Sequence, residues 1–369
     1  MKNNFAILFV LILLPFAAQL SAQKLSPEVD KQELLEVMYV GARTGGNEKY
    51  VNDSTNPIPE PKTFTRIYRS PEIAFDNLWE LWCNNDNTAI ITVRGSTAAS
   101  KSWLANFYAA MIPAKGEITN ADGESLNYCF SEHPQAYVHA GWTISTTFLM
   151  QDIAPRIDSI YKTGVRNLII TGHSQGGAIA YLLTAEILHK INTGIFPKNL
   201  QIKTYCTAAP RVGNLYFAYD FEQITQGGWA FNIINPLDWV PEMPLSVQST
   251  ADFNPINPFA KVSEKFKQEK LPKRIALKRI YKLLKKHPEK AVKNYQKILG
   301  DKLTTRVNNA IGEITIPEFT NSMHYVRTGQ SFILKPNEFY HEKFPHNPNK
   351  IFTHHSHHAY ICLINQTTD

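Results

Sequence analysis

The apolar residues of this chain follow two alternating spacings. Short runs rich in β-branched and aromatic residues predict strands, and longer runs with helical spacing predict helices. The predicted strands cover residues 64–69, 78–83, 89–93, 136–139, 168–171, 202–206, 230–235 and 325–334. The predicted helices cover residues 26–41, 102–111, 142–161, 177–188, 213–224 and 355–364. Ser26 is the predicted cap of the first helix. This alternation favours an α/β fold with a mostly parallel central sheet flanked by helices.

The alternation breaks between the strands at 230–235 and 325–334. Residues 245–320 begin with a stretch rich in Pro, Asn and Ser and continue into a lysine-rich helical stretch at 262–299. We interpret them as a helical insert or cap on a loop of one domain that spans residues 23–369, because surface loops tolerate insertions.

The net charge of the chain is unevenly distributed. Residues 261–306 hold 16 Lys or Arg and four Asp or Glu, a local charge of +12, so a total of +6 leaves −6 for the rest of the chain. The basic insert fits a solvated helix or a surface attracted to an anionic membrane or lipid interface. No nucleic-acid motif accompanies it, and nucleic acid is not an expected partner.

The first 22 residues have the pattern of an export signal. Lys2 precedes an uncharged apolar run from Phe5 to Phe16, and small residues stand before a predicted cut after Ala22. The run is shorter than the roughly 20 residues that span a membrane. The sequence therefore predicts a periplasmic or extracellular protein. Its four cysteines are compatible with disulfides or with buried thiols: Cys83, Cys129, Cys206 and Cys362.

The strongest chemical signal is the pentapeptide Gly172-His173-Ser174-Gln175-Gly176. A predicted strand precedes it and a predicted helix follows, which is the context of a nucleophile elbow. Ser174 is therefore the candidate nucleophile. The backbone N–H of Gln175 at the helix start is a candidate oxyanion donor, and the polar turn from Thr92 to Thr97 is a place for a second donor.

A serine nucleophile needs a base and an orienting acid. Asp238 follows the strand at 230–235 and is the candidate acid, with Asp252 as the alternative. Six of the 12 histidines lie between His341 and His358, so a metal site is a rival explanation. Two adjacent histidine pairs without a nearby acid make a weak ligand set, and we expect neither a metal nor another cofactor.

Five ordered blocks resemble the class 3 (fungal-type) lipase family of α/β-hydrolases. The sequence differs from the family pattern at two positions in or near these blocks, because the family often has Leu at the position of Gln175 and Asp at that of Asn106. The blocks are Val93-Arg94-Gly95-Ser96 with Trp103 downstream, Val138-His139-Ala140-Gly141-Trp142, Gly172 to Ala178, Pro210-Arg211-Val212-Gly213-Asn214, and Asp238-Trp239-Val240-Pro241.

The resemblance implies Ser174 as nucleophile, Asp238 as acid and His355 as base. His355 stands five residues before Tyr360, a spacing common in the family, and His357 is the fallback. The N–H groups of Ser96 and Gln175 would form the oxyanion hole.

The implied function is that of a secreted, bacterial-looking serine ester hydrolase. Its substrate would be a triacylglycerol or another lipid ester, hydrolysed through an acyl-enzyme. Residues 98–110 form either an amphipathic lid or a core-facing helix. The alternatives are a non-catalytic lipid-binding or regulatory protein on the same fold, or a feruloyl-type esterase or acyltransferase.

Overall fold

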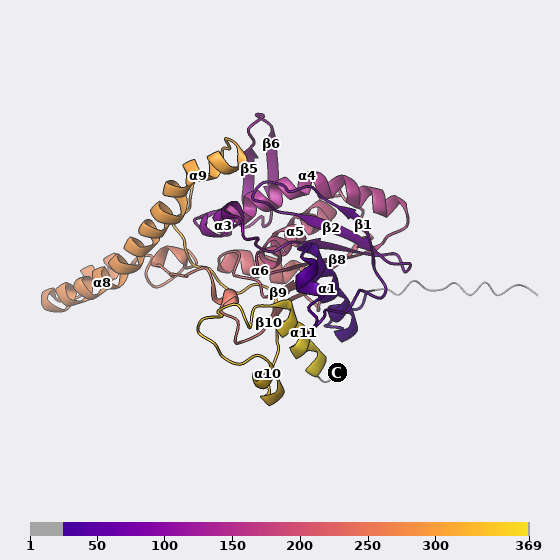
Figure 1. Cartoon of the computed structure of the whole chain (residues 1–369). Coiled ribbons are helices and arrows are strands. Elements are labelled where there is room, and N and C mark those ends of the chain that lie inside the picture. The colour runs from indigo at the N-terminus through magenta and orange to yellow at the C-terminus, as the bar shows by residue number, and fades with distance from the viewer. Residues whose placement is uncertain (1–24, 368–369) are drawn as a thin grey trace, which may run out of the picture.

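A computed structural model describes residues 25–367 of the chain (Figure 1). The predicted export signal lies outside these residues. Within them, no helix is long and apolar enough to cross a membrane.

The fold is built on a seven-stranded sheet with the order β1-β2-β3-β8-β9-β10-β11. The first two pairings, β1 with β2 and β2 with β3, are antiparallel, and the remaining four are parallel. The sheet is therefore mostly parallel, as expected. The strands are β1 (Thr65–Arg69), β2 (Trp79–Cys83), β3 (Thr88–Val93), β8 (Asn167–His173), β9 (Gln201–Thr207), β10 (Ala230–Ile234) and β11 (Gln330–Ile333).

Helices cover both faces of this sheet. Neighbouring residues of a strand point to opposite faces, and on β8 Ile170 packs in one hydrophobic cluster while Ile169 packs in another. The cluster around Ile170 includes residues of α4 (Ala140–Lys162), α5 (Gln175–Asn192) and α6 (Leu215–Ile224). The cluster around Ile169 includes α1 (Lys31–Thr44) and α11 (His357–Gln366). This three-layer arrangement is an α/β-hydrolase fold.

Smaller elements surround the three layers. Strands β4 (Met111–Pro113) and β7 (Tyr137–His139) form one antiparallel pair, and β5 (Lys115–Thr119) and β6 (Ser125–Cys129) form another. The short helices are α2 (Glu48–Val51), α3 (Ser100–Phe107) and α10 (Glu338–Lys343), with 3₁₀ turns η1 (Val240–Glu242) and η2 (Thr250–Asp252).

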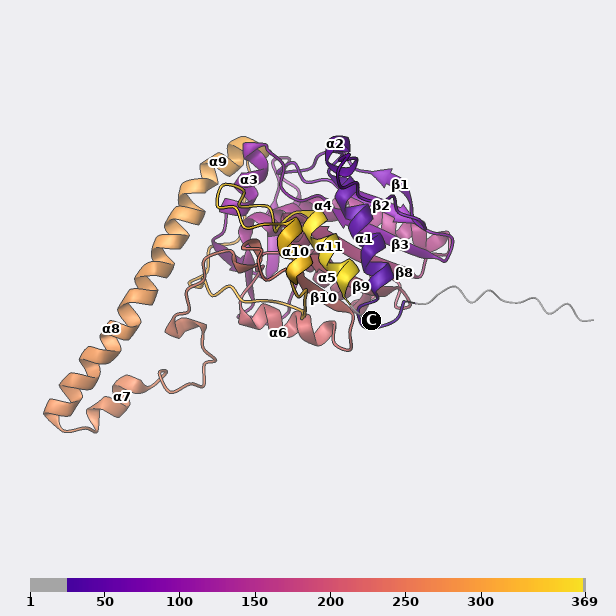
Figure 2. The same ribbon diagram turned by 60° about the horizontal axis from the view of Figure 1, so that its bottom comes forward.

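The lysine-rich stretch is helical. It contains α7 (Val262–Lys267), α8 (Leu271–Gln296), the π-helical turn η3 (Lys297–Asp301) and α9 (Lys302–Ile311). Figures 1 and 2 show α8 extending away from the layered body. The insert boundaries at 245 and 320 stay a prediction.

The expected start of the first helix was wrong. This helix begins at Lys31 and is capped by Asp30, whose carboxylate accepts a hydrogen bond from the N–H of Glu33 at 2.8 Å. Ser26 lies before that helix and does not cap it, because Asp30 provides the cap one turn later. Of the two alternatives left open for the four cysteines, the structure has free thiols.

The elbow requires glycine for steric reasons. A Cβ on Gly176 would lie 2.1 Å from the carbonyl oxygen of Val93, and one on Gly172 would lie 2.2 Å from the backbone of Gly176. Real Cβ atoms do not approach backbone this closely, so α5 can start against β3 and β8 only without these side chains.

We expect Gly176→Ala to lower the free energy of unfolding by at least about 1–3 kcal/mol, the usual cost of overpacking. Gly45→Ala is the matched control, because Gly45 has φ −66° and a Cβ added there would have nothing within 4 Å. Urea denaturation of both variants measures the difference. Equal stabilities would contradict the steric role of Gly176.

Candidate active site

Ser174 stands in a strained turn between β8 and α5. Its backbone has φ 60° and ψ −128°, a region that L-residues rarely adopt. Its N–H donates to the carbonyl of Thr207 at 3.0 Å, which holds the turn against β9. The strained turn places the side chain at the N-terminus of α5, where the helix dipole favours negative charge.

The Asp238 carboxylate is buried and accepts three hydrogen bonds. Its Oδ2 accepts from the His355 Nδ1 at 2.7 Å and from the Tyr360 hydroxyl at 3.0 Å. Its Oδ1 accepts from the N–H of Val240 at 3.0 Å. With Nδ1 bonded to Asp238, His355 has Nε2 left as the ring nitrogen for proton transfer.

His173 connects the serine turn to the histidine loop. Its Nε2 is 2.6 Å from the carbonyl oxygen of His355, and its Nδ1 is 2.9 Å from the Thr207 hydroxyl. The rings of His173 and His355 are 4.9 Å apart between centroids. Burial and the neighbouring His355 lower the pKa of His173 to about 3, so it is neutral and Nε2 donates to the carbonyl.

The structure thus brings Ser174, His355 and Asp238 to the same edge of the sheet. Among residues 25–367, no hydrogen bond joins the Ser174 hydroxyl to His355. Free enzymes often have such contacts long or misaligned until substrate binds.

The fallback histidine has different surroundings. His357 is half-buried, stacks on His173 with ring centroids 4.1 Å apart, and its Nδ1 lies 3.4 Å from the Tyr50 hydroxyl. Burial lowers its pKa well below the usual value. The Asp238 carboxylate faces His355 and not His357.

The alternative acid, Asp252, is occupied elsewhere. It is buried, and its carboxylate accepts from the N–H of Ser249 at 2.7 Å and from the Ser322 hydroxyl at 2.5 Å. These bonds close a loop of the insert region and explain its burial without a catalytic role.

Asn106 links the two predicted oxyanion donors. Its amide nitrogen donates to the Ser96 hydroxyl at 2.9 Å, and its amide oxygen accepts from Gln175 Nε2 at 2.9 Å and from Trp142 Nε1 at 3.0 Å. Within residues 25–367, the N–H groups of Ser96 and Gln175 donate no hydrogen bond, as an oxyanion site requires. The two departures from the family pattern are therefore in contact with each other.

His139 contacts the backbone of two members of this network, Asn106 and Trp142. Its Nδ1 accepts from the N–H of Trp142 at the start of α4, and its Nε2 is 3.1 Å from the carbonyl oxygen of Asn106. The ring stacks on Trp142 with centroids 3.6 Å apart. Burial lowers the pKa of His139 to about 3, so the ring stays neutral and Nε2 donates.

Aromatic side chains surround the candidate base. Phe352 lies 5.8 Å from the His355 ring, and the rings of Trp239 and Trp103 lie 5.6 Å and 6.5 Å from Phe352. Trp103 belongs to α3, whose Phe107 is 55% exposed, so α3 presents apolar surface beside the site. Helix α3 also buries Ser102 and Ala105, so it has a core-facing side as well.

A separate hollow of about 390 Å³ lies next to Asp238 and is not lined by Ser174. Its lining includes Arg211, Arg327 and Glu242. Apolar residues also line it, so the lining is mixed: Ile234, Pro236, Pro241 and Ile333.

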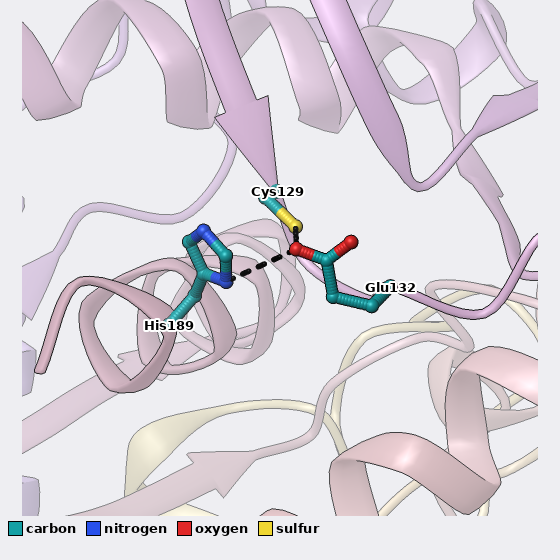
Figure 3. Close-up of side chains that lie close together, drawn as sticks. All are labelled: Cys129, Glu132 and His189. Carbon is teal, nitrogen blue, oxygen red and sulfur yellow. Dashed lines mark hydrogen bonds and ion pairs between the residues drawn. The ribbon is translucent and has the colours of Figure 1, made fainter. Parts of the chain in front are cut away.

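One group of side chains has metal-ligand types. Cys129, Glu132 and His189 each offer a ligand atom, and these atoms lie within 4.8 Å of one another (Figure 3). However, Lys115 Nζ contacts the Glu132 carboxylate at 2.5 Å, and burial raises the pKa of the Cys129 thiol to about 12. A neighbouring ammonium and a protonated thiol both oppose a cation there.

Comparisons with known proteins find similarity to lipases. Residues 90–248 match the family model described as lipase (class 3), a segment that holds Ser96, Ser174, Gln175 and Asp238 and ends before His355. The chain is 27% identical over 154 residues to a secreted mono- and diacylglycerol lipase of Malassezia restricta, covering 42% of this chain and 46% of that protein. It is 37% identical over 111 residues to a lipase of Rhizopus niveus, covering 30% and 27%.

A chloroplastic phospholipase A1 of Arabidopsis thaliana is 28% identical over 162 residues, covering 42% of this chain and 32% of that protein. The match thus spans less than half the length of these relatives. They are fungal and plant proteins and do not support a bacterial-looking origin. Among solved structures, a fungal lipase–inhibitor complex is 20% identical, with a TM-score of 0.43 over 58% of this chain and 74% of that one.

Three features of the site were not predicted from the sequence. They are the Tyr360 hydroxyl on Asp238, the His173 bond to the histidine loop, and the Asn106 link between Ser96 and Gln175. Each residue left a signal without its contact: Asn106 as a departure from the family pattern, Tyr360 in its spacing from His355, and His173 within the elbow pentapeptide.

We expect Asn106→Ala to lower kcat for ester hydrolysis on the order of 10–10²-fold with little change in KM, because misplacing a transition-state donor affects the chemical step. Asn106→Asp keeps the acceptor for Gln175 and Trp142 and can accept from the Ser96 hydroxyl, so it should restore most of kcat. Steady-state kinetics of both variants test this. Equal losses in the two variants would contradict a positioning role.

We expect acid to destabilise the fold through His139 and His173. Their pKa values fall from 6.5 to about 3 on folding, so the unfolded chain binds more protons below pH 6.5. The free energy of unfolding is therefore highest above pH 6.5 and is lost as the pH falls toward 3, by up to about 1.4 kcal/mol per pH unit for each histidine. Urea denaturation from pH 7 to 4 measures the slope. His139→Asn should make it shallower, and an unchanged slope would contradict the assignment.

Proposed function

We propose that this protein is a serine carboxylic-ester hydrolase that acts on lipid esters. The observation that carries the proposal is the pair Asp238–His355 at the same sheet edge as the Ser174 elbow. The class 3 lipase match over residues 90–248 supports the same chemistry.

In the proposed reaction, His355 Nε2 removes the hydroxyl proton of Ser174 as the oxygen attacks the ester carbonyl. The N–H groups of Ser96 and Gln175 hold the oxyanion of the tetrahedral intermediate. The imidazolium, stabilised by Asp238, then protonates the leaving alcohol. A water molecule, deprotonated by the same nitrogen, releases the acid from the acyl-Ser174 intermediate.

An apolar substrate fits the surroundings of the base. Trp103, Phe352 and Trp239 form an aromatic group beside His355, and Phe107 is exposed on α3. The relatives are named as mono- and diacylglycerol lipase, lipase and phospholipase A1, so we propose a glycerolipid ester as the substrate class. Export to the periplasm or the extracellular space is part of the proposal and is supported by the word "secreted" in the name of one relative.

The alternative is a lipid-binding or regulatory protein without catalysis. It predicts a replacement at one or more of the proposed triad positions, whereas Ser174, Asp238 and His355 are all present in the sequence. A feruloyl-type esterase or an acyltransferase would use the same residues and would differ in the pocket or the acceptor.

We expect the wild type to hydrolyse p-nitrophenyl esters with a preference for longer acyl chains, and Ser174→Ala to lower kcat on the order of 10⁶-fold. His355→Ala should cause a comparable loss. His357→Ala should retain most of the turnover, because His357 has no contact with Asp238. Turnover is followed by release of p-nitrophenolate with butyrate, octanoate and palmitate esters.

Several outcomes would change the proposal. If none of the esters is hydrolysed in a Ser174-dependent way, the proposal that the protein is an enzyme is refuted. Preference for butyrate with no gain on an emulsion would indicate an esterase. Retained activity in His355→Ala with loss in His357→Ala would move the base to His357.

A further inference from the structure

The lysine-rich helices form a long extension that the proposed reaction does not use. We name residues 262–301, which contain α7, α8 and η3, the basic arm. Figures 1 and 2 show α8 pointing away from the body in both views. Val292 is the single buried residue of α8, so nearly the whole helix is open to a partner.

One side of α8 is mainly apolar, with Ile280 and Leu284 exposed and Leu277 half-buried. Leu277, Ile280 and Leu284 are spaced by three and four residues, which places them on one face of a helix. Ile280 is 55% exposed, Leu284 is 62% exposed, and Leu283 beside them is 52% exposed. Tyr281, at the edge of this face, contacts Phe259 and Phe266 of the preceding segment. Large aliphatic side chains left in water at this spacing indicate an interaction surface.

The other side of α8 is strongly basic. Helical spacing places on it the exposed Leu271 and Ile275 together with a larger set of cations: Arg274, Lys278, Lys282, Lys285, Lys286 and Lys293. Lys282, Lys285, Lys286, Lys290 and Lys293 also line a shallow hollow of about 730 Å³ on this side. Glu289 is the one acidic residue of α8, and it contacts Lys285 at 3.5 Å. Most of the positive charge therefore has no partner within the arm.

An exposed helix with one apolar and one basic side fits an anionic phospholipid surface. The aliphatic side chains enter the boundary between headgroups and acyl chains, and the lysines approach the phosphates. The arm holds 13 Lys or Arg and four Asp or Glu, a charge of +9, so the total of +6 leaves −3 for the rest of the chain, and an anionic membrane attracts the arm and repels the remainder. A second copy of the arm would bring two strongly positive helices together, and a nucleic acid would leave the aliphatic face in water.

The base of the arm is attached beside the candidate site. The N–H of Ala110 donates to the carbonyl of Leu299 at 3.3 Å, and a hydrogen bond of 3.0 Å joins the hydroxyls of Tyr108 and Thr304. Tyr108 follows the last residue of α3 directly. The arm thus joins the body just after the end of α3.

We propose that the basic arm docks the protein on anionic phospholipid membranes through the aliphatic and lysine side chains of α8. The docking itself does not depend on catalysis. The further idea that docking brings lipid esters to Ser174 rests on the proposed function.

The test is co-sedimentation of the full-length Ser174→Ala protein with vesicles, so that hydrolysis cannot alter the lipid. We expect binding to vesicles of phosphatidylcholine with 30 mol% phosphatidylglycerol, weaker binding in higher salt, and little binding to pure phosphatidylcholine. Replacing Lys282, Lys285 and Lys286 by Gln should weaken binding roughly 10²-fold, at roughly fivefold per lysine near an anionic surface. Replacing Ile280 and Leu284 by Asn should also weaken it.

A matched control removes the same charge from the body. Lys49, Lys162 and Lys198 are exposed, and their change to Gln should leave vesicle binding unchanged. Equal effects of the two triple variants, or equal binding to both vesicle types, would overturn the proposal. A wild-type dimer in sedimentation equilibrium that Ile280→Asn dissociates, without vesicle binding, would assign the aliphatic face to a second copy instead. Because these assays need no turnover, their failure is distinguishable from failure of the proposed ester hydrolysis.

Discussion

The arrangement of the candidate site depends on the buried carboxylate of Asp238. A carboxylate out of water is costly unless its oxygens are hydrogen-bonded, and here His355, Tyr360 and the N–H of Val240 provide those bonds. Because Tyr360 lies in α11 and His355 shortly precedes that helix, the same bonds fasten the C-terminal helix to the loop after β10. Satisfying one buried charge therefore also orients the candidate base.

Two further constraints bring that base to the nucleophile. Glycines at 172 and 176 let α5 start against β3 and β8, which forces Ser174 into positive φ. His173, made neutral by burial, bonds the carbonyl of His355. These two histidines are 182 residues apart in the chain, and this bond between a side chain and a backbone oxygen holds the serine turn and the histidine loop together. The network around Asn106 similarly ties α3 to the start of α5.

The basic arm has a different kind of stability from the body. Its contacts with the body are concentrated at the C-terminal end of α8 and at η3, where Val292 packs with Met111 and Tyr325 and the carbonyl of Leu299 accepts from Ala110. The rest of α8 leaves its aliphatic face in water. A helix of this length gains most of its stability from packing, and α8 has little packing of its own. Docking on a lipid surface would cover the apolar side chains of α8 that the body leaves exposed to water. It would thus explain both the positive charge of the arm and its exposed aliphatic side chains.

The order of strands and helices, the mostly parallel sheet and the Ser174 elbow follow from local sequence, because apolar periodicity and glycine positions act over a few residues. The first helix was misplaced because Ser26-Pro27 resembles a cap, whereas Asp30 provides it. The spacing to Tyr360 favoured His355 over His357, but local sequence does not bring either ring to Asp238, since both histidines stand near the same helix start. That choice, like the link through Asn106, depends on which side chains meet across the fold. Long-range packing sets such contacts, and only the tertiary structure places Asp238 against His355.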